Sequence, residues 1–194
     1  MADSKNIWAA TLHSDGGSFY RASLGTALPS DPLASLPVAW KDQGWVGDDG
    51  FKLSPKRDTK KHKAFGGSTV KVTQDNYECT VKVTLFESNI DSLRTVFGDS
   101  NVVGSTVNGH QQYKVNWTET QLPRSSFVVR FIDGNKTGLH VIEEAQITAV
   151  EDIEYVHDKL VKYSVTLDVY KPSTTGHPYI YTLIDDPDDT TADS

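Results

Sequence analysis

The side chains that most often perform catalysis or bind metal ions are dispersed along this chain. Six histidines show no H-x-H spacing, and the single cysteine, Cys79, cannot form a C-x-x-C pair. His140 and Glu143 form an isolated H-x-x-E sequence without a second histidine four residues after the first, so a zinc site is not predicted. The DDPDD sequence at 185–189 lacks the central glycine and closing glutamate of a calcium loop.

The sequence therefore predicts no catalytic or cofactor-binding centre. No G-x-S-x-G sequence, phosphate-binding loop or dinucleotide fingerprint is present. Serine, aspartate and histidine are frequent enough for a triad to be assembled in space, but no motif points to one. Cys79 lies where apolar and polar residues alternate, which favours a buried structural thiol over a nucleophile. We expect a protein that is not an enzyme and that carries no metal ion or cofactor.

Positive charge is concentrated in one short segment that follows a GDDG sequence. Its basic residues are Lys56, Arg57, Lys60, Lys61, His62 and Lys63, interrupted by Asp58 and Thr59. A charge run of this kind is commonly a solvated face or loop. Contact with nucleic acid is disfavoured, because few aromatic residues lie between the lysines to stack on bases.

Negative charge gathers in the segment 139–156, which contains no lysine or arginine. Its acidic residues are Glu143, Glu144, Glu151, Asp152 and Glu154. On an amphipathic strand, Glu144, Asp152 and Glu154 would project from the polar face, because side chains alternate between the two faces of a strand. The simplest interpretation is a solvated strand face.

The overall charge argues against a protein that binds DNA through its phosphates. The 194 residues carry a formal net charge of −7, from 26 acidic and 19 basic residues. Five aspartates lie in the last ten residues, which leaves 21 acidic against 19 basic residues in the body. A DNA-binding surface needs a basic face, and only one segment is basic. No signal peptide or long apolar run is seen, so we expect synthesis in a reducing cytoplasm and no membrane contact.

The elements that position these charges are predicted to be mostly strands. Three prolines within 24–38 predict an extended connector, because proline fixes φ and removes a donor. The next strand, 38–46, is expected to enter a turn at Gly47–Gly50. Period-two alternation of valines then predicts a hairpin that begins after Gly66 and Gly67.

One helix is predicted, over Ser88–Phe97. Ser88 is a good N-cap, and Asp91 suits the positive end of the helix. Gly98 can end the helix with a left-handed conformation. An apolar stripe at helical spacing supports this assignment. Its residues are Ile90, Leu93, Val96 and Phe97.

Further strands are predicted in the second half. Asp133, Gly134 and Asn135 form a turn signal. A three-residue turn at His157–Lys159 would align the apolar faces of the last long pair and set Glu154 opposite Lys162. The strands expected along the whole chain, besides those already given, are 18–24, 111–118, 126–132, 139–142, 145–156, 160–170 and 179–184.

These elements together predict a mainly β protein, an antiparallel β-sandwich or partly open barrel with one flanking α-helix. A chain of this length is expected to form a single domain. We divide it into a flexible N-terminal segment at 1–17, a β domain at 18–184 with an extended basic arm at 47–67, and an acidic C-terminal tail at 185–194.

Four segments follow one another in a characteristic order in the first half of the chain. They are LGTALPSDP at 24–32, QGWVGDDGFKLSPKR at 43–57, AFGG at 64–67 and TLFESNIDSLRTVFG at 84–98. This order resembles the major tail tube proteins of long-tailed, non-contractile bacteriophages, the siphoviruses. The second half agrees only as a run of strands.

The resemblance implies a structural subunit of the virion that assembles into stacked hexameric rings around a channel for DNA ejection. Its partners would be other copies and the tail proteins at the tip and terminator, and the genomic DNA would pass without specific binding. The basic arm would dock on an acidic surface of the neighbouring ring. The arm residues are Lys56, Arg57, Lys60, Lys61 and Lys63.

The resemblance also suggests a role for the acidic segment. Glu144, Asp152 and Glu154 could face the channel, where negative charge would repel phosphates and let DNA slide. Other ring-forming tail proteins and secretion-system tube proteins have a similar fold and stay alternatives.

Ten of the twelve tryptophans and tyrosines allow one further interpretation. On a β scaffold they could form a sugar-stacking platform, as in a carbohydrate-binding module. Aromatic residues more often supply buried area in cores and subunit interfaces. These residues are Trp8, Trp40, Trp45, Tyr113, Trp117, Tyr155, Tyr163, Tyr170, Tyr179 and Tyr181.

Overall fold

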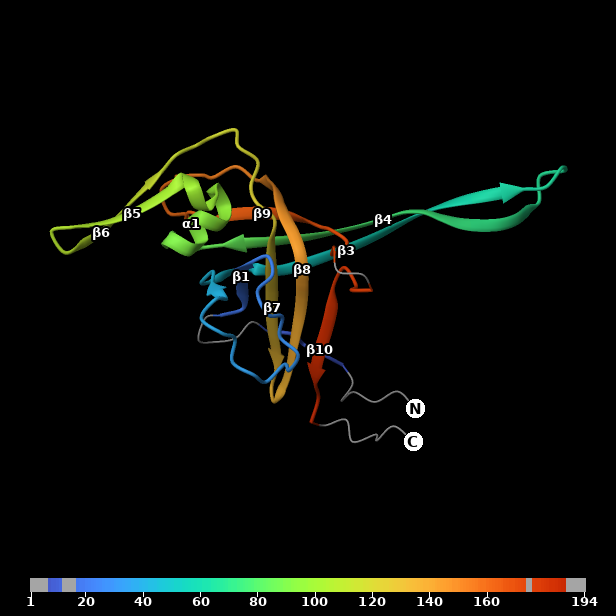
Figure 1. Ribbon diagram of the computed structural model, residues 1–194, viewed down its shortest axis with the longest axis horizontal. Coiled ribbons are helices and arrows are strands. Elements are labelled where there is room, and N and C mark those ends of the chain that lie inside the picture. The colour runs from blue at the N-terminus through green and yellow to red at the C-terminus, as the bar shows by residue number, and fades with distance from the viewer. Residues whose placement is uncertain (1–6, 12–16, 174–175, 188–194) are drawn as a thin grey trace.

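The computed structural model describes residues 7–11, 17–173 and 176–187 and shows a mainly antiparallel β protein with one α-helix, as predicted (Figure 1). Eight strands form one sheet in the order β2-β1-β7-β8-β9-β4-β3, with β10 paired to β8, and β5 and β6 form a separate hairpin. The strands are β1 (Phe19–Ser23), β2 (Lys41–Asp42), β3 (Val46–Lys63), β4 (Thr69–Leu85), β5 (Val102–Val107), β6 (His110–Val115), β7 (Ser125–Asp133), β8 (Lys136–Val150), β9 (Tyr163–Val169) and β10 (Tyr181–Asp185).

The long strand β8 joins the two parts of the sheet. One edge of β8 pairs with β7, and the other edge pairs first with β10 and then with β9. The register shifts between Ile142 and Ala145 and again between Ile147 and Ala149. Bulges bend a strand and increase its twist. The sheet therefore folds over into two parts that run in different directions, without closing into a barrel (Figure 1).

The main core lies between the two parts of the sheet and the helix. Phe19 of β1 and Phe127 of β7 stack there with ring centroids 5.4 Å apart, and both are almost fully buried. A smaller cluster lies on the opposite face of β7 and β8, where Val128 and Leu139 are covered by Trp40 and the proline-rich connector. Successive residues of β7 thus enter two different cores, which explains its continuous apolar sequence.

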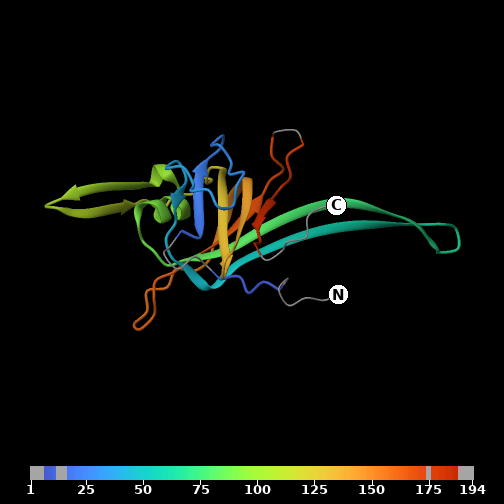
Figure 2. The same cartoon turned by 90° about the horizontal axis from the view of Figure 1, so that it is seen from below.

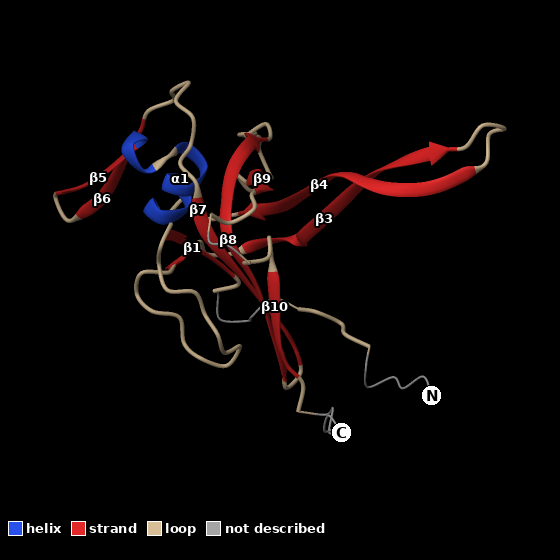
Figure 3. Ribbon diagram, turned by 45° about the vertical axis from the view of Figure 1, so that its right-hand side comes forward, coloured by secondary structure: helices blue, strands red, loops and turns tan. Residues whose placement is uncertain are grey.

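The helix α1 (Ile90–Phe97) lies at one end of the sheet beside β5 and β6 (Figure 3). Its N-cap is Asn89, whose side-chain oxygen accepts a hydrogen bond from the backbone N–H of Ser92 at 2.8 Å. The prediction of Ser88 as the cap is wrong, because the Ser88 hydroxyl pairs with the Tyr163 hydroxyl at 2.9 Å. Asp91 does lie in the first turn, and Gly98 follows with a φ of 99°.

The predicted turn at Gly47–Gly50 is wrong. Residues 47–50 are part of β3. Gly47 and Gly50 lie where the pairing of β3 with β4 shifts register, between Val46 and Phe51. The strand predicted over 38–46 is reduced to the two residues of β2. Glycine and aspartate therefore mark a bulge here, which interrupts the ladder without reversing the chain.

Strand boundaries in the second half also differ from the prediction. The segments 139–142 and 145–156 belong to the single strand β8, which ends at Val150. The expected turn near 157–159 is present, but Glu154 there contacts the ammonium of Lys159 at 3.4 Å. The strand β5 was not predicted, because its Gly-Ser-Thr centre lacks alternation. It pairs with β6 across a turn in which Asn108 and Gly109 both have positive φ.

Both hairpins project from the body, β3–β4 at one end of the long axis and β5–β6 at the other (Figures 1 and 2). Within the described part of the chain, no helix combines the length and apolarity needed to span a membrane.

Candidate assembly surfaces

The basic arm predicted from the sequence is the outer half of a long β-hairpin. β3 and β4 pair from Val46 with Leu85 to Lys63 with Thr69, whereas β9 covers only Thr80–Leu85 of β4. From Pro55 to Lys63 the hairpin therefore extends without a third strand beside it, over roughly 27 Å at 3.4 Å per residue. The sequence allowed either a solvated face or a loop for this segment. The segment is a paired strand, because the return strand at 69–79 supplies its hydrogen bonds.

Lysines lie on both faces of this outer hairpin. Lys60 pairs with Thr73 on one face, and Lys61 pairs with Val72 on the other. Among the described residues, no carboxylate lies within 4.0 Å of the ammonium groups of Lys60, Lys61, Lys63 or Lys71, while Lys56 lies 3.6 Å from both Asp58 and Glu78. The outer hairpin has no buried face, and among the described residues the lysines near its tip have no carboxylate within ion-pair distance. Both features are typical of a surface that binds another molecule.

The base of the hairpin is held by aromatic contacts. Tyr77 of β4 meets Tyr179 edge to face with centroids 4.8 Å apart, and the Arg57 guanidinium lies 5.1 Å from the Tyr77 ring centre. Cys79 is buried beside them, as expected of a structural thiol, and burial raises the pKa of this thiol. A two-stranded hairpin is marginally stable alone, so these contacts set the direction in which it projects.

An aromatic hollow lies at the other end of the molecule. Phe97 of α1 and Trp117, which follows β6, pack with centroids 4.8 Å apart, and Tyr155 and Tyr163 line the same hollow of about 330 Å³. Trp117 and Tyr155 are 72% and 75% exposed. Partial burial and the neighbouring Tyr163 raise the pKa of Tyr155. We call this surface the aromatic hollow.

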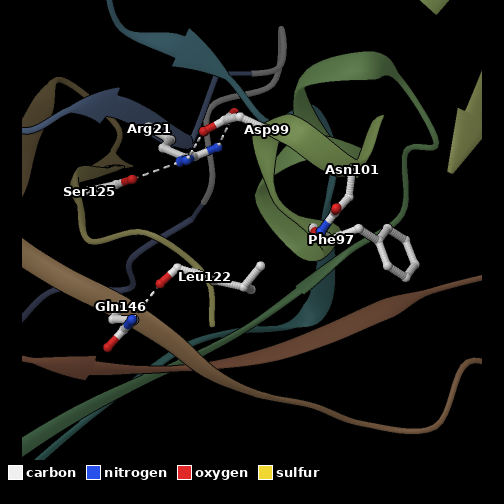
Figure 4. A network of polar contacts seen from close by, with 7 residues as sticks. All are labelled: Arg21, Phe97, Asp99, Asn101, Leu122, Ser125 and Gln146. Carbon is white, nitrogen blue, oxygen red and sulfur yellow. Dashed lines mark hydrogen bonds and ion pairs between the residues drawn. The ribbon is translucent and has the colours of Figure 1, made fainter. Parts of the chain in front are cut away.

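A polar network fixes the elements that build the hollow (Figure 4). Arg21 of β1 forms a bidentate ion pair with Asp99, just after α1, at 2.7 and 3.0 Å, and its Nε donates to Ser125. The amide of Asn101 donates to the Phe97 carbonyl oxygen and to the Thr118 hydroxyl. Asn101 thereby holds the end of the helix next to the segment that carries Trp117.

The candidate channel-lining carboxylates do not share one strand face. Glu144 is in β8 with its side chain 10% exposed, and it contacts the Arg124 guanidinium at 2.5 Å. Asp152 and Glu154 lie beyond the end of β8 in an exposed loop. The bulges in β8 break the alternation on which the sequence argument depended. A position of any of the three on a channel wall stays a prediction.

The acidic loop, residues 150–158, borders the aromatic hollow through Tyr155. It carries Glu151, Asp152, Glu154 and Asp158 and no lysine or arginine, and all four are exposed. The backbone N–H of Glu151 still donates to the Ser164 carbonyl oxygen at 2.8 Å, so the loop is anchored where it leaves β8.

The described segments 7–11 and 186–187 lie close to the turn between β7 and β8. Thr11 pairs with Ile132, and Trp8 packs edge to face on Phe131, so this part of the predicted flexible segment contacts the body. Asp186 of the acidic tail forms a largely buried ion pair with Lys136 at 2.8 Å. Residues 188–194 of the tail lie outside the described residues.

Within the described residues, no group of three or more His, Cys, Asp or Glu side chains is arranged to hold a metal ion. His140 instead faces Thr182 and Phe131, and burial lowers the pKa of its imidazole. His177 contacts the Glu143 carboxylate.

The aromatic hollow could not be located from the sequence. Its aromatic residues come from three distant segments with no common spacing, so the sequence analysis could give the tryptophans and tyrosines only as one group.

Comparison with known proteins gives one family. A family model described as phage tail tube protein matches residues 3–192. A search among curated proteins found no match. Among solved structures, the chain is similar to one in the virion of a native gene transfer agent (GTA) particle, with 14% identity, 78% of this chain and 96% of that chain covered, and a TM-score of 0.42.

Proposed function

This chain belongs to the phage tail tube protein family, and we propose that it is the main tube subunit of a long-tailed, non-contractile phage. In this proposal, six copies form a ring, and rings stack around a channel through which DNA leaves the virion. The family match over nearly the whole chain carries the proposal. Neither a catalytic centre nor a cofactor is part of it.

The β3–β4 hairpin supports the stacking of rings. It projects from the body with four lysines near its tip that have no carboxylate within ion-pair distance among the described residues. A long exposed hairpin is a risk for aggregation unless a partner covers it. We assign Lys56, Arg57, Lys60, Lys61 and Lys63 to contacts between rings.

The open edges of the sheet support closure of the ring. The sheet ends at β2 on one side and at β3 on the other, so unpaired backbone groups are left at both ends. Pairing of such edges between neighbouring copies would produce a continuous inner wall, and a head-to-tail contact that closes generates a ring.

The proposed partners are further copies of this chain, with other tail proteins capping the tube at its tip and terminator. The site of action is the virion tail, after synthesis in the host cytoplasm. DNA passes without specific binding, consistent with a net charge of −7. Family membership favours this function over a carbohydrate-binding module.

The test is the mass and shape of the purified protein as concentration and salt are varied. Light scattering should report masses well above the 21.4 kDa of one chain, and negative-stain images should show hollow rings or tubes. A protein that stays monomeric and binds a glycan in a screen would contradict the proposal.

A further inference from the structure

A projecting tip and a hollow lie far apart on this molecule. The tip of the β3–β4 hairpin, residues 64–68, is at one end of the long axis, whereas α1 and β6, which line the aromatic hollow, lie toward the other end, where the β5–β6 hairpin projects (Figure 1). Copies that associate head to tail bring one such end against the other. In such a contact, one patch of the first copy meets a different patch of the second copy.

The hairpin tip presents a single large apolar side chain. Phe65 is fully exposed, between Ala64 and the glycine pair Gly66 and Gly67, which both have positive φ. The turn is closed by hydrogen bonds from Ala64 N–H to the Ser68 oxygen and from Gly67 N–H to the Ala64 oxygen. Because the turn is already closed, the backbone that carries Phe65 has little conformational freedom to lose on binding, and burial of the exposed ring is favourable.

The aromatic hollow can accept a ring of this size. An apolar cavity of about 150 Å³ is enough to bind benzene, and the hollow measures about 330 Å³. Phe97, Trp117 and Tyr163 line it, and aromatic rings favour stacked or edge-to-face contact with another aromatic ring.

Charge around the two features is complementary. Lys60, Lys61, Lys63 and Lys71 surround the tip, with no acidic residue between 59 and 74. The acidic loop at 150–158 lies beside the hollow and has four exposed carboxylates, of which Glu154 lies 3.4 Å from the ammonium of Lys159, just after the loop. Opposite potentials on facing surfaces fix the register of a complex and speed its formation.

We propose that the β3–β4 hairpin of one copy inserts Phe65 into the aromatic hollow of a second copy, with its lysines against the acidic loop of that copy. The tube arrangement of these copies rests on the proposed function, whereas the pairwise contact does not need it. Asp152 and Glu154 then serve contact between copies, in place of the channel wall suggested from the sequence.

Trapping by disulfide formation tests this contact between copies. The single native cysteine is buried, so Cys79→Ala provides a background without thiols. One sample carries Ser68→Cys, in the same exposed turn, which keeps Phe65, and a second, with a mass tag, carries Tyr155→Cys. The matched control replaces the second with Val38→Cys, which is 86% exposed and far from the hollow in sequence. Mixtures are oxidised briefly, and mixed dimers are measured by mass.

We expect the Ser68→Cys and Tyr155→Cys mixture to form mixed dimers at least fivefold faster than the control mixture. Lys60→Glu with Lys61→Glu should remove most of this difference, and Asp152→Lys with Glu154→Lys in the second copy should restore it. Equal rates for the two mixtures would overturn the proposed contact. Tubes that form normally despite equal rates would leave the proposed function intact, because its readout is assembly and not this contact.

Discussion

The rings of Tyr77 and Tyr179 meet edge to face at 4.8 Å, where the long hairpin leaves the sheet. Tyr77 belongs to β4, whereas Tyr179 lies just before β10, more than a hundred residues later. The contact ties the hairpin to a different edge of the fold. It therefore determines where the tip is carried relative to the body.

Replacing Tyr179 by alanine should loosen the base of the hairpin. An aromatic pair contributes about 0.5–1.5 kcal/mol beyond the area that it buries. We expect trypsin to cleave the hairpin lysines several times faster in Tyr179→Ala, with a small loss of global stability. Tyr113→Ala, in a partly exposed tyrosine of β6, is the control. Equal cleavage rates in the two variants would show that the contact does not order the hairpin.

Neutralising the tip of the hairpin should weaken association without unfolding the subunit. In the variant, Lys60, Lys61, Lys63 and Lys71 become glutamine. Because attraction between surface charges is screened by salt, wild-type assemblies should dissociate as salt rises, and the variant should show little such dependence. A control with the same charge change replaces Lys41, Lys82, Lys114 and Lys171. Sedimentation velocity measures both, and loss of assembly in both would assign the effect to net charge alone.

Asp186→Ala should be strongly destabilising for a residue so near the C-terminus. Lys136 and Asp186 are 2.8 Å apart with side chains 7% and 15% exposed. Breaking a buried ion pair by removing one partner costs about 3 kcal/mol or more. Asp49→Ala removes a partner of exposed Lys52 at 3.6 Å and should cost about 1 kcal/mol or less. Urea unfolding compares the two variants, and similar midpoints would contradict the burial argument.

The N-cap of α1 gives a local test of the fold. Asn89→Ala should cost about 1 kcal/mol, because the Ser92 N–H loses its acceptor. Asn89→Ser keeps a side-chain oxygen at the cap and should be close to wild type in thermal unfolding. If alanine and serine at this position unfold at the same temperature, the cap assignment is wrong.

The buried imidazole of His140 predicts loss of stability at acid pH. Burial lowers its pKa below the ordinary 6.5, so the unfolded chain binds the proton more readily than the native state. Stability is therefore present above 6.5 and is lost as pH falls through 6.5 toward the native pKa. His140→Gln should show a smaller loss between pH 7.5 and 5 in chemical unfolding. The same loss in both proteins would exclude His140 as its source.

Local patterns in the sequence predict the fold class well. Period-two alternation located the strand that follows Gly67, but the hairpin predicted to begin there is wrong, because Thr69–Leu85 is the single strand β4 and pairs with β3. Helical spacing located α1. These signals are local, since alternation and capping depend on residues a few positions apart. The choice of Asn89 over Ser88 as the cap is not local, because Tyr163 recruits the Ser88 hydroxyl from a strand far along the chain.

The surfaces were less predictable than the elements. Two bulges in β8 change which residues face the core, so the parity that grouped Glu144 with Asp152 and Glu154 does not continue beyond Ile147. Gly138 lies opposite Phe131, and a Cβ there would lie 2.2 Å from the ring. A contact of this kind depends on register, which a single sequence does not specify. The aromatic hollow likewise exists only after three distant segments have met.

Electron cryomicroscopy of assemblies formed by the full chain tests the central claim most directly. The account predicts end-on views with sixfold symmetry around a hollow centre, and side views in which each long hairpin crosses from its own ring to the next. Rings of another symmetry, or hairpins that end in solvent without reaching a neighbouring ring, would contradict it.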